Sequence, residues 1–209
     1  MGDFAVIRPR DDAAAQQAAD WCDQLVSDFL AAGHAVSADV DDTSPADTAN
    51  IISALGSSAT LVCYFGHGDD DSWLTGGTAT IDASNVGAGA GKAVVSVACR
   101  TGRNLGPDAI TAGVTSWLGF TIKVPVFAIA LYKNVDPIGE AIVGGLSGLG
   151  TGGTMGQARA AIEANCDQLA ADFDSGPLAT HPVSQIGYYA ALSLRDHVVL
   201  HGSSGFAPL

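Results

Sequence analysis

Short runs of consecutive apolar residues alternate with longer amphipathic segments along most of this chain. An apolar run of about five residues is typical of a strand buried on both faces of a parallel sheet. Apolar residues spaced three or four positions apart instead indicate a helix. The apolar runs predict strands over residues 4–8, 34–40, 60–65, 93–98, 114–120 and 197–200.

The amphipathic segments predict the helices. The pair Asp11-Asp12 favours a helix start and Gly33 favours its end. A second helix is expected from Thr43, with Pro45 in its first turn, to Gly56. Further helices are expected over 105–112, 126–132, 137–149, from a capping box at Thr154 onward, and over 186–194.

Strands and helices therefore alternate along the chain, and residues 69–91 form a long polar, glycine-rich excursion between two of the strands. This order is typical of a mainly parallel sheet covered by helices on both faces. We expect a three-layer α/β/α sandwich, and we expect residues 1–209 to form one domain, because no repeat or low-complexity linker interrupts the sequence.

Two of the predicted strands are each followed by a reactive side chain. Gly66-His67-Gly68 follows the strand at 60–65, and Cys99 follows the strand at 93–98. Parallel sheets bind ligands at the carboxyl ends of their strands, so neighbouring strands would bring His67 and Cys99 to one edge. A thiol nucleophile and an adjacent histidine base are the two groups that acyl transfer to a cysteine requires at minimum.

The position of Cys99 distinguishes it from the other three cysteines. Cys22 and Cys166 fall within predicted helices and Cys63 lies in the middle of a strand, where structural roles are expected. Cys99 instead precedes a polar turn and a helix start, which favour the thiolate. The four cysteines have neither disulfide-scaffold nor metal-site spacing.

Charge and composition exclude several function classes. The formal net charge of −13 disfavours nucleic acid as a partner. No apolar stretch approaches the roughly 20 residues of a membrane span, and the N-terminus carries no targeting pattern. We therefore expect reduced thiols in a cytoplasmic protein. The excess of Asp over Glu and Lys is explained equally by adaptation to high salt and by a GC-rich genome.

The residues around His67 and Cys99 carry a resemblance to a known family. The blocks Tyr64-Phe-Gly-His-Gly68 and Ser96-Val-Ala-Cys-Arg-Thr-Gly102 are similar to the signature of the caspase–haemoglobinase cysteine peptidases (clan CD). Residues 102–119 resemble the helix and strand after the nucleophile in gingipain-like and CHAT-type members. The resemblance extends over about residues 58 to 135.

This resemblance implies a caspase-like endopeptidase with a His–Cys dyad. His67 would act as general base and acid, Cys99 as the nucleophile, and the Gly68 and Cys99 amides as the oxyanion hole. It implies a polypeptide substrate, no metal or cofactor and no third orienting carboxylate. A regulatory partner protein is a further possibility, since the chain shows no evident prodomain or recognition domain.

Substrate preference stays open at this stage. Asp69, Asp70 and Asp71 follow the histidine and either favour Lys or Arg at the cleaved position or form a solvated acidic loop. Arg100 and Arg103 favour acidic side chains instead, or form local ion pairs. Trp73 and Trp117 are candidate walls of the substrate cleft and equally candidate packing residues.

Three alternatives remain beside the peptidase. A class I amidotransferase or deglycase-like hydrolase would pair Cys99 with a later histidine such as His181, although Val97 stands where that class usually has glycine. A catalytically degenerate caspase-like domain would serve as a binding module. A metal held by His67, Asp69 and Asp71 is disfavoured, because no second histidine lies at ligand spacing.

Overall fold

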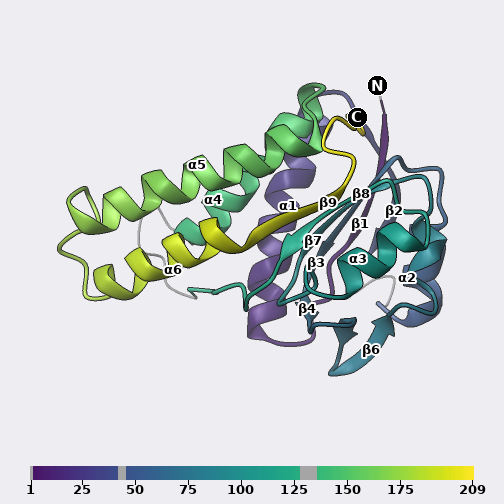
Figure 1. Cartoon of the computed structure of the whole chain (residues 1–209), viewed down its shortest axis with the longest axis horizontal. Helices are drawn as coiled ribbons and strands as arrows, with labels where there is room; N and C mark the ends of the chain where they lie inside the picture. Colours follow the sequence, from purple (N-terminus) through teal and green to yellow (C-terminus); the bar gives the residue numbers. More distant parts are fainter. Residues whose placement is uncertain (1, 42–45, 128–135) are drawn as a thin grey trace.

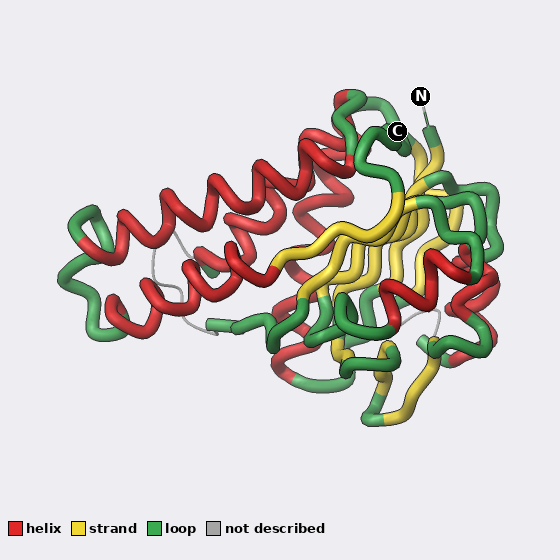
Figure 2. The backbone as a smooth tube through the Cα atoms, viewed as in Figure 1, coloured by secondary structure: helices red, strands yellow, loops and turns green. Residues whose placement is uncertain are grey.

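A six-stranded sheet in the order β2-β1-β3-β7-β8-β9 lies at the centre of the protein (Figures 1 and 2). The structure is a computed structural model that describes residues 2–41, 46–127 and 136–209. Five strands run parallel, and β9 pairs antiparallel with β8 at one edge. The strands are β1 (Asp3–Ile7), β2 (Ala35–Val40), β3 (Leu61–Phe65), β7 (Ala93–Val97), β8 (Ser116–Phe120) and β9 (Val198–Gly202).

The central strands β3, β7 and β8 are buried along their whole length, as their unbroken apolar runs predict. Successive side chains of each strand alternate between two apolar clusters, one on either face of the sheet. In β3, for example, Cys63 belongs to one cluster and Tyr64 to the other. The sheet is therefore the middle layer of three.

Helices cover both faces of the sheet. On one face lie α1 (Ala13–Ala31), α4 (Pro137–Leu146) and α5 (Met155–Asp174), and the 3₁₀ turn η2 (Ser147–Thr151) follows α4. On the other face lie α2 (Thr48–Leu55), α3 (Leu105–Thr111) and the 3₁₀ turn η1 (Val86–Gly89). The three-layer α/β/α sandwich predicted from the sequence is confirmed.

A long helical hairpin extends beyond the sheet. The predicted capping box at Thr154 opens α5, which packs against α6 (Ser184–His197), and α6 leads directly into β9 (Figure 1). The segment 175–183, which joins the two helices, lies at the end of the hairpin farthest from the sheet (Figure 1). Within the described ranges, no helix combines the length and the apolar character needed to cross a membrane.

The excursion between β3 and β7 is more ordered than the sequence indicates. It forms a small antiparallel sheet of β4 (His67–Gly68), β5 (Trp73–Thr75) and β6 (Thr78–Ile81). Gly76 and Gly77, both with positive φ, form the turn between β5 and β6. Asp11, just before α1, accepts a hydrogen bond from the Gly76 amide, so this turn is tied to the start of α1.

Three of the predicted helices need correction. The second helix begins after Asp47, whose carboxylate caps it, rather than at Thr43, and residues 42–45 lie outside the described part of the chain. The helix expected over 126–132 is absent at 126–127, which have no regular secondary structure, and 128–135 lie outside the described ranges. The helix expected over 137–149 turns into 3₁₀ geometry from Ser147.

Candidate active site

The structure brings His67 and Cys99 to the same edge of the sheet. β3 and β7 are adjacent parallel strands whose last residues, Phe65 and Val97, lie opposite each other. His67 comes two residues after the end of β3, and Cys99 two residues after the end of β7. Both line one cavity of about 80 Å³, together with Ala14, Ala18, Trp21, Gly66, Val97, Val124 and Val126.

Glycine at position 68 allows the histidine strand to approach the cysteine turn. A Cβ atom on Gly68 would lie 2.6 Å from Thr101 Cγ2, closer than a real Cβ atom comes to its neighbours, and 3.1 Å from the Cys99 carbonyl oxygen, which is a tight contact. The Tyr64 hydroxyl lies 2.8 Å from the His67 carbonyl oxygen and 2.9 Å from that of Leu74, and so anchors β4 against β5. The absence of a side chain at Gly68 thus permits the close approach of the histidine segment to the cysteine turn.

A third residue, Asp12, contacts the histidine. One carboxylate oxygen of Asp12 accepts hydrogen bonds from the Ala14 and Ala15 amides and caps α1. The other oxygen lies 2.8 Å from His67 Nε2. The Ala15 amide, with the bond to His67 in support, holds the pKa of the Asp12 carboxyl below its ordinary value. Asp12 is therefore an anionic partner fixed to a helix terminus.

Sequence reasoning missed Asp12 as a site residue. The acidic pair before the first helix predicts a helix start, which is correct for Asp12 but incomplete. His67 stands 55 positions away, and only the packing of α1 beside the end of β3 brings the two together. The carboxylate that the family resemblance did not lead us to expect is present in the structure.

The turn that presents Cys99 rests on a buried hydrogen-bond network. Trp73 Nε1 donates to Ser96 Oγ at 2.9 Å, and Ser96 Oγ lies 2.9 Å from Thr101 Oγ1. Arg100, directly after the cysteine, has a φ of 61°, a left-handed conformation that is uncommon outside glycine. Network and turn together hold the backbone around Cys99 in a sharp bend.

Cys99 is also the most accessible thiol. It is partly exposed, whereas Cys22, Cys63 and Cys166 are fully buried. Burial raises the pKa of Cys22 and of Cys166 to about 12 and raises that of Cys63 well above its ordinary value. These three thiols therefore stay protonated inside the core, in the structural roles that the sequence predicts.

The acidic loop after His67 is engaged in local contacts. Asp69 accepts hydrogen bonds from the amides of Asp71 and Ser72 and from the Ser72 hydroxyl. Asp70 pairs with Arg100 at 3.1 Å and with Arg103 at 3.4 Å. Asp71 accepts from the Asn104 side chain at 2.7 Å. The loop thus fastens β4–β5 to the segment that follows Cys99.

The two tryptophans that were candidate cleft walls are core residues. Trp73 and Trp117 are both 0% exposed, and their rings stack with centroids 5.6 Å apart. Tyr64 stacks on the other side of Trp73 at 4.2 Å. This aromatic stack lies beneath the Cys99 turn and supports it from within the core.

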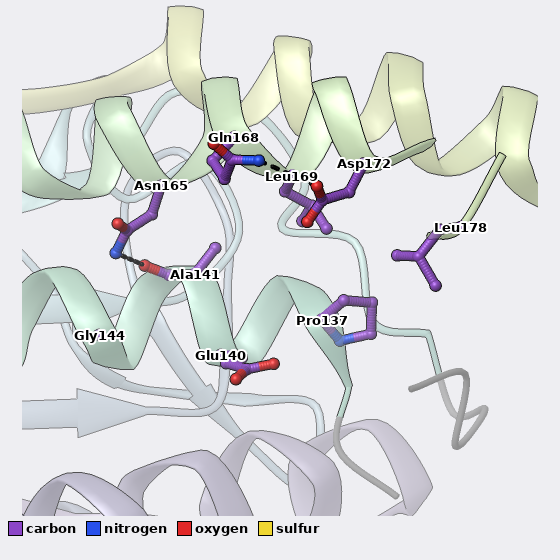
Figure 3. Close-up of a pocket in the computed structure, with 9 residues that line it drawn as sticks. All are labelled: Pro137, Glu140, Ala141, Gly144, Asn165, Gln168, Leu169, Asp172 and Leu178. Atoms are coloured by element: carbon purple, nitrogen blue, oxygen red, sulfur yellow. Dashed lines mark hydrogen bonds between the residues drawn. The ribbon is translucent and has the colours of Figure 1, made fainter. Parts of the chain in front are cut away.

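Other candidate residues and grooves lie elsewhere. His181 is in the segment between α5 and α6, remote from the sheet edge, where its Nδ1 accepts a hydrogen bond from the Val183 amide. A groove of about 360 Å³ lies between α4 and α5 (Figure 3). Asn165 bonds to Ala141 and Gln168 to Asp172 within it, and neither thiol nor imidazole lines it.

Comparison with known proteins defines the fold. No family model matches the sequence, and no curated protein does. Two solved structures match over 100% of this chain. The first is "Crystal structure of the Arg specific cysteine proteinase gingipain R (RGPB)", with a TM-score of 0.61 and 15% sequence identity. The second is "Complex of Porphyromonas gingivalis RgpB pro- and mature domains", with a TM-score of 0.59 and 14% sequence identity.

The chain spans about half the length of these structures, 47% and 48% respectively. At this identity the likeness establishes the fold alone. The mainly parallel sheet with its helices on both faces is the caspase-like fold of the gingipain neighbours.

Proposed function

We propose that the protein is a caspase-like cysteine endopeptidase in which Cys99 is the nucleophile and His67 the general base and acid. The observation that carries the proposal is that these two residues line one cavity at the carboxyl edge of the sheet. The remaining histidines of the described chain do not line that cavity, and the remaining thiols are buried. The gingipain-like fold supports the same conclusion.

The proposed reaction follows from these positions. His67 accepts the thiol proton, and Cys99 Sγ attacks the carbonyl carbon of the substrate peptide bond. The amides of Gly68 and Cys99 stabilise the oxyanion that develops. His67 then protonates the leaving amine, and water hydrolyses the resulting thioester to release the acid and restore the thiol.

Asp12 completes the proposed site as a positioning residue. It lies 2.8 Å from Nε2 of His67, which leaves Nδ1 as the ring nitrogen that exchanges a proton with Cys99. A carboxylate at this position fixes the tautomer and the orientation of the ring and stabilises the imidazolium formed during reaction. Because the helix N-terminus holds Asp12, this orientation persists before substrate binds.

A peptide-library assay tests the proposal. Cys99→Ala and His67→Ala should each lower kcat/KM by at least about 1,000-fold, because the two residues act as a unit. Cys166→Ala, which removes a buried thiol from α5, is the matched control and should keep its activity. Cleavage that survives Cys99→Ala would remove this cysteine from the mechanism, and a folded protein that cleaves no member of the library would favour the binding module.

The proposal takes a polypeptide as substrate. Cytoplasmic location, the absence of nucleic-acid and membrane partners, and a regulatory partner protein stay predictions from the sequence. One of the neighbour structures is of a complex between the pro- and mature domains of RgpB.

A further inference from the structure

The cavity beside Cys99 has an almost wholly apolar lining. Ala14, Ala18 and Trp21 of α1 form one wall, and Val124 and Val126 form another. His67 and Cys99 complete it. In the proposed reaction Cys99 bonds to a carbonyl carbon, and the Cα bonded to that carbon carries a side chain. The cavity is therefore placed to receive the side chain of the residue on the acyl side of the cleaved bond.

Among the described residues, no Asp or Glu side chain lines this cavity to pair with a basic side chain. Both oxygens of Asp12 are engaged, one by the α1 amides and one by His67. Asp69, Asp70 and Asp71 bind Ser72, the two arginines and Asn104, as described above. Burying a Lys or Arg side chain here without a partner would carry the large cost of an unpaired charge.

An acidic side chain of the substrate would also lack a partner in this cavity. Arg100 and Arg103 both pair with Asp70, and Arg103 also donates to the Thr121 carbonyl oxygen at 2.6 Å. Neither arginine lines the cavity. These arginines are therefore paired outside the cavity, whose lining apart from His67 and Cys99 offers only apolar contact.

The size of the cavity limits the side chain. Its volume is about 80 Å³. An engineered cavity of about 150 Å³ holds benzene, and at about half that volume this pocket suits a short aliphatic side chain better than an aromatic ring. Ala14 and Ala18 are small residues on the α1 face, and their size is what leaves this space open.

We propose, on the basis of the proposed function, that the enzyme cleaves after a small aliphatic residue such as Val or Ala rather than after a basic, acidic or aromatic one. The arginine specificity of the gingipain neighbour does not extend to this chain under this proposal. Ala18 and Val124 are then specificity-determining residues.

Peptidyl acyloxymethyl ketones that differ only in the residue next to the ketone test this directly. The series carries Ala, Val, Phe, Arg or Asp at that position, and intact-protein mass spectrometry measures the rate at which each labels Cys99. We expect Val and Ala to label at least about tenfold faster than Phe, Arg and Asp, the discrimination that a fitted apolar pocket provides.

Variants of the cavity residues test whether the cavity determines the preference for Val and Ala. Ala18→Leu fills it and should slow labelling by the Val ketone about tenfold or more, while Ala31→Leu, an exposed substitution at the far end of α1, should leave the rate unchanged. Val124→Ala enlarges the cavity and should raise the relative rate of the Phe ketone.

The outcomes of these experiments test the aliphatic preference separately from the proposed peptidase function. Fastest labelling by the Arg or Asp ketone would overturn the apolar preference and leave Cys99 as the nucleophile. Equal rates across the series, or an Ala18→Leu variant that keeps the Val preference, would overturn the assignment of this cavity. Failure of every ketone to label Cys99 in the folded protein would contradict the proposed function as well.

Discussion

Asp12 serves two parts of the molecule at once. Its first carboxylate oxygen accepts from the unpaired amides at the start of α1, and its second oxygen contacts His67. The side chain is 56% exposed, so the contact lies at the mouth of the site, where solvent screens its electrostatic contribution. Its value in the proposed mechanism is therefore orientation of the imidazole more than electrostatic stabilisation.

Replacing Asp12 by Asn separates these two roles. Asn is as good an N-cap as Asp, so the melting temperature should change little. An amide cannot act as the anionic partner of His67, and we expect kcat to fall about 10- to 100-fold with KM nearly unchanged. Steady-state kinetics and thermal unfolding of the same preparation measure both effects.

Asp12→Ala is the companion variant for this test. It removes the cap as well and should lower both activity and the melting temperature. If kcat of Asp12→Asn equals that of the unchanged protein, Asp12 is only a helix cap.

At the scale of elements, the site depends on how closely β4 approaches the Cys99 turn. The sequence predicts that two strands end in reactive residues, because buried apolar runs and the glycines around His67 are local signals. It does not show that Gly68 packs against Thr101 and the Cys99 carbonyl, a contact between segments about 30 residues apart. The short strands β4, β5 and β6 were likewise missed, since two to four residues are too few for a periodic pattern.

Gly68→Ala tests this close approach. The added methyl group would meet Thr101 Cγ2 at 2.6 Å, so β4 must shift away from the cysteine turn. We expect kcat/KM to fall at least about tenfold, because a displacement of about 1 Å is costly in a catalytic site.

Combining Gly68→Ala with Thr101→Ser should recover part of the lost activity. Serine lacks the clashing methyl group and keeps the hydroxyl that contacts Ser96. Thr101→Ser alone is the control. Unchanged kinetics in the Gly68→Ala variant would show that the spacing of the two segments does not limit the reaction.

Ser96 joins the aromatic stack to the Cys99 turn. Ser96→Ala leaves the buried indole N–H of Trp73 without its acceptor and removes the partner of Thr101 Oγ1. An unsatisfied buried polar group costs about 1–3 kcal/mol, and we expect the free energy of unfolding to fall by that amount. Urea denaturation measures it.

An exposed serine provides the matched control for this loss. Ser53→Ala, on the solvent side of α2, should change the free energy of unfolding by less than about 0.5 kcal/mol. Equal effects of the two substitutions would mean that the buried network contributes nothing to stability.

At the scale of the whole molecule, most of the architecture was predictable from the sequence. The six apolar runs, the helix caps and the glycine at the end of α1 all agree with one three-layer fold. Boundaries were less accurate where local signals compete: Thr43 and Pro45 resemble a helix start, yet Asp47 is the cap that the structure uses. Asp12 and the apolar cavity depend on tertiary packing, which no local pattern records.

The stability of the molecule should depend on pH through Asp136. This residue is 3% exposed, caps α4 and accepts the Phe127 and Ile138 amides. Burial raises the pKa of its carboxyl to about 6. The folded state then binds a proton more tightly than the unfolded chain, so this contribution to stability is complete at low pH and is lost as the pH rises from about 4 to about 6.

Asp136→Asn removes this titration and keeps one of the two acceptor oxygens, so one of the two amides loses its acceptor at every pH and the pH dependence alone is compared. Urea unfolding across that pH range should show a steeper decline for the unchanged protein than for Asp136→Asn, and the difference should not exceed about 3 kcal/mol. Parallel profiles for the two proteins would contradict a raised pKa at Asp136.

The most direct test of the central claim, that His67 activates Cys99, is the rate at which iodoacetamide alkylates the folded protein. The other three thiols are buried, so alkylation in the native state reports on Cys99 alone, and peptide mapping verifies the site. Near neutral pH we expect His67→Ala to slow alkylation of Cys99 at least about tenfold, because the thiolate is the reactive form and His67 is the base proposed to take the thiol proton. A rate that is the same with and without His67 would contradict the dyad and, with it, the proposed peptidase activity.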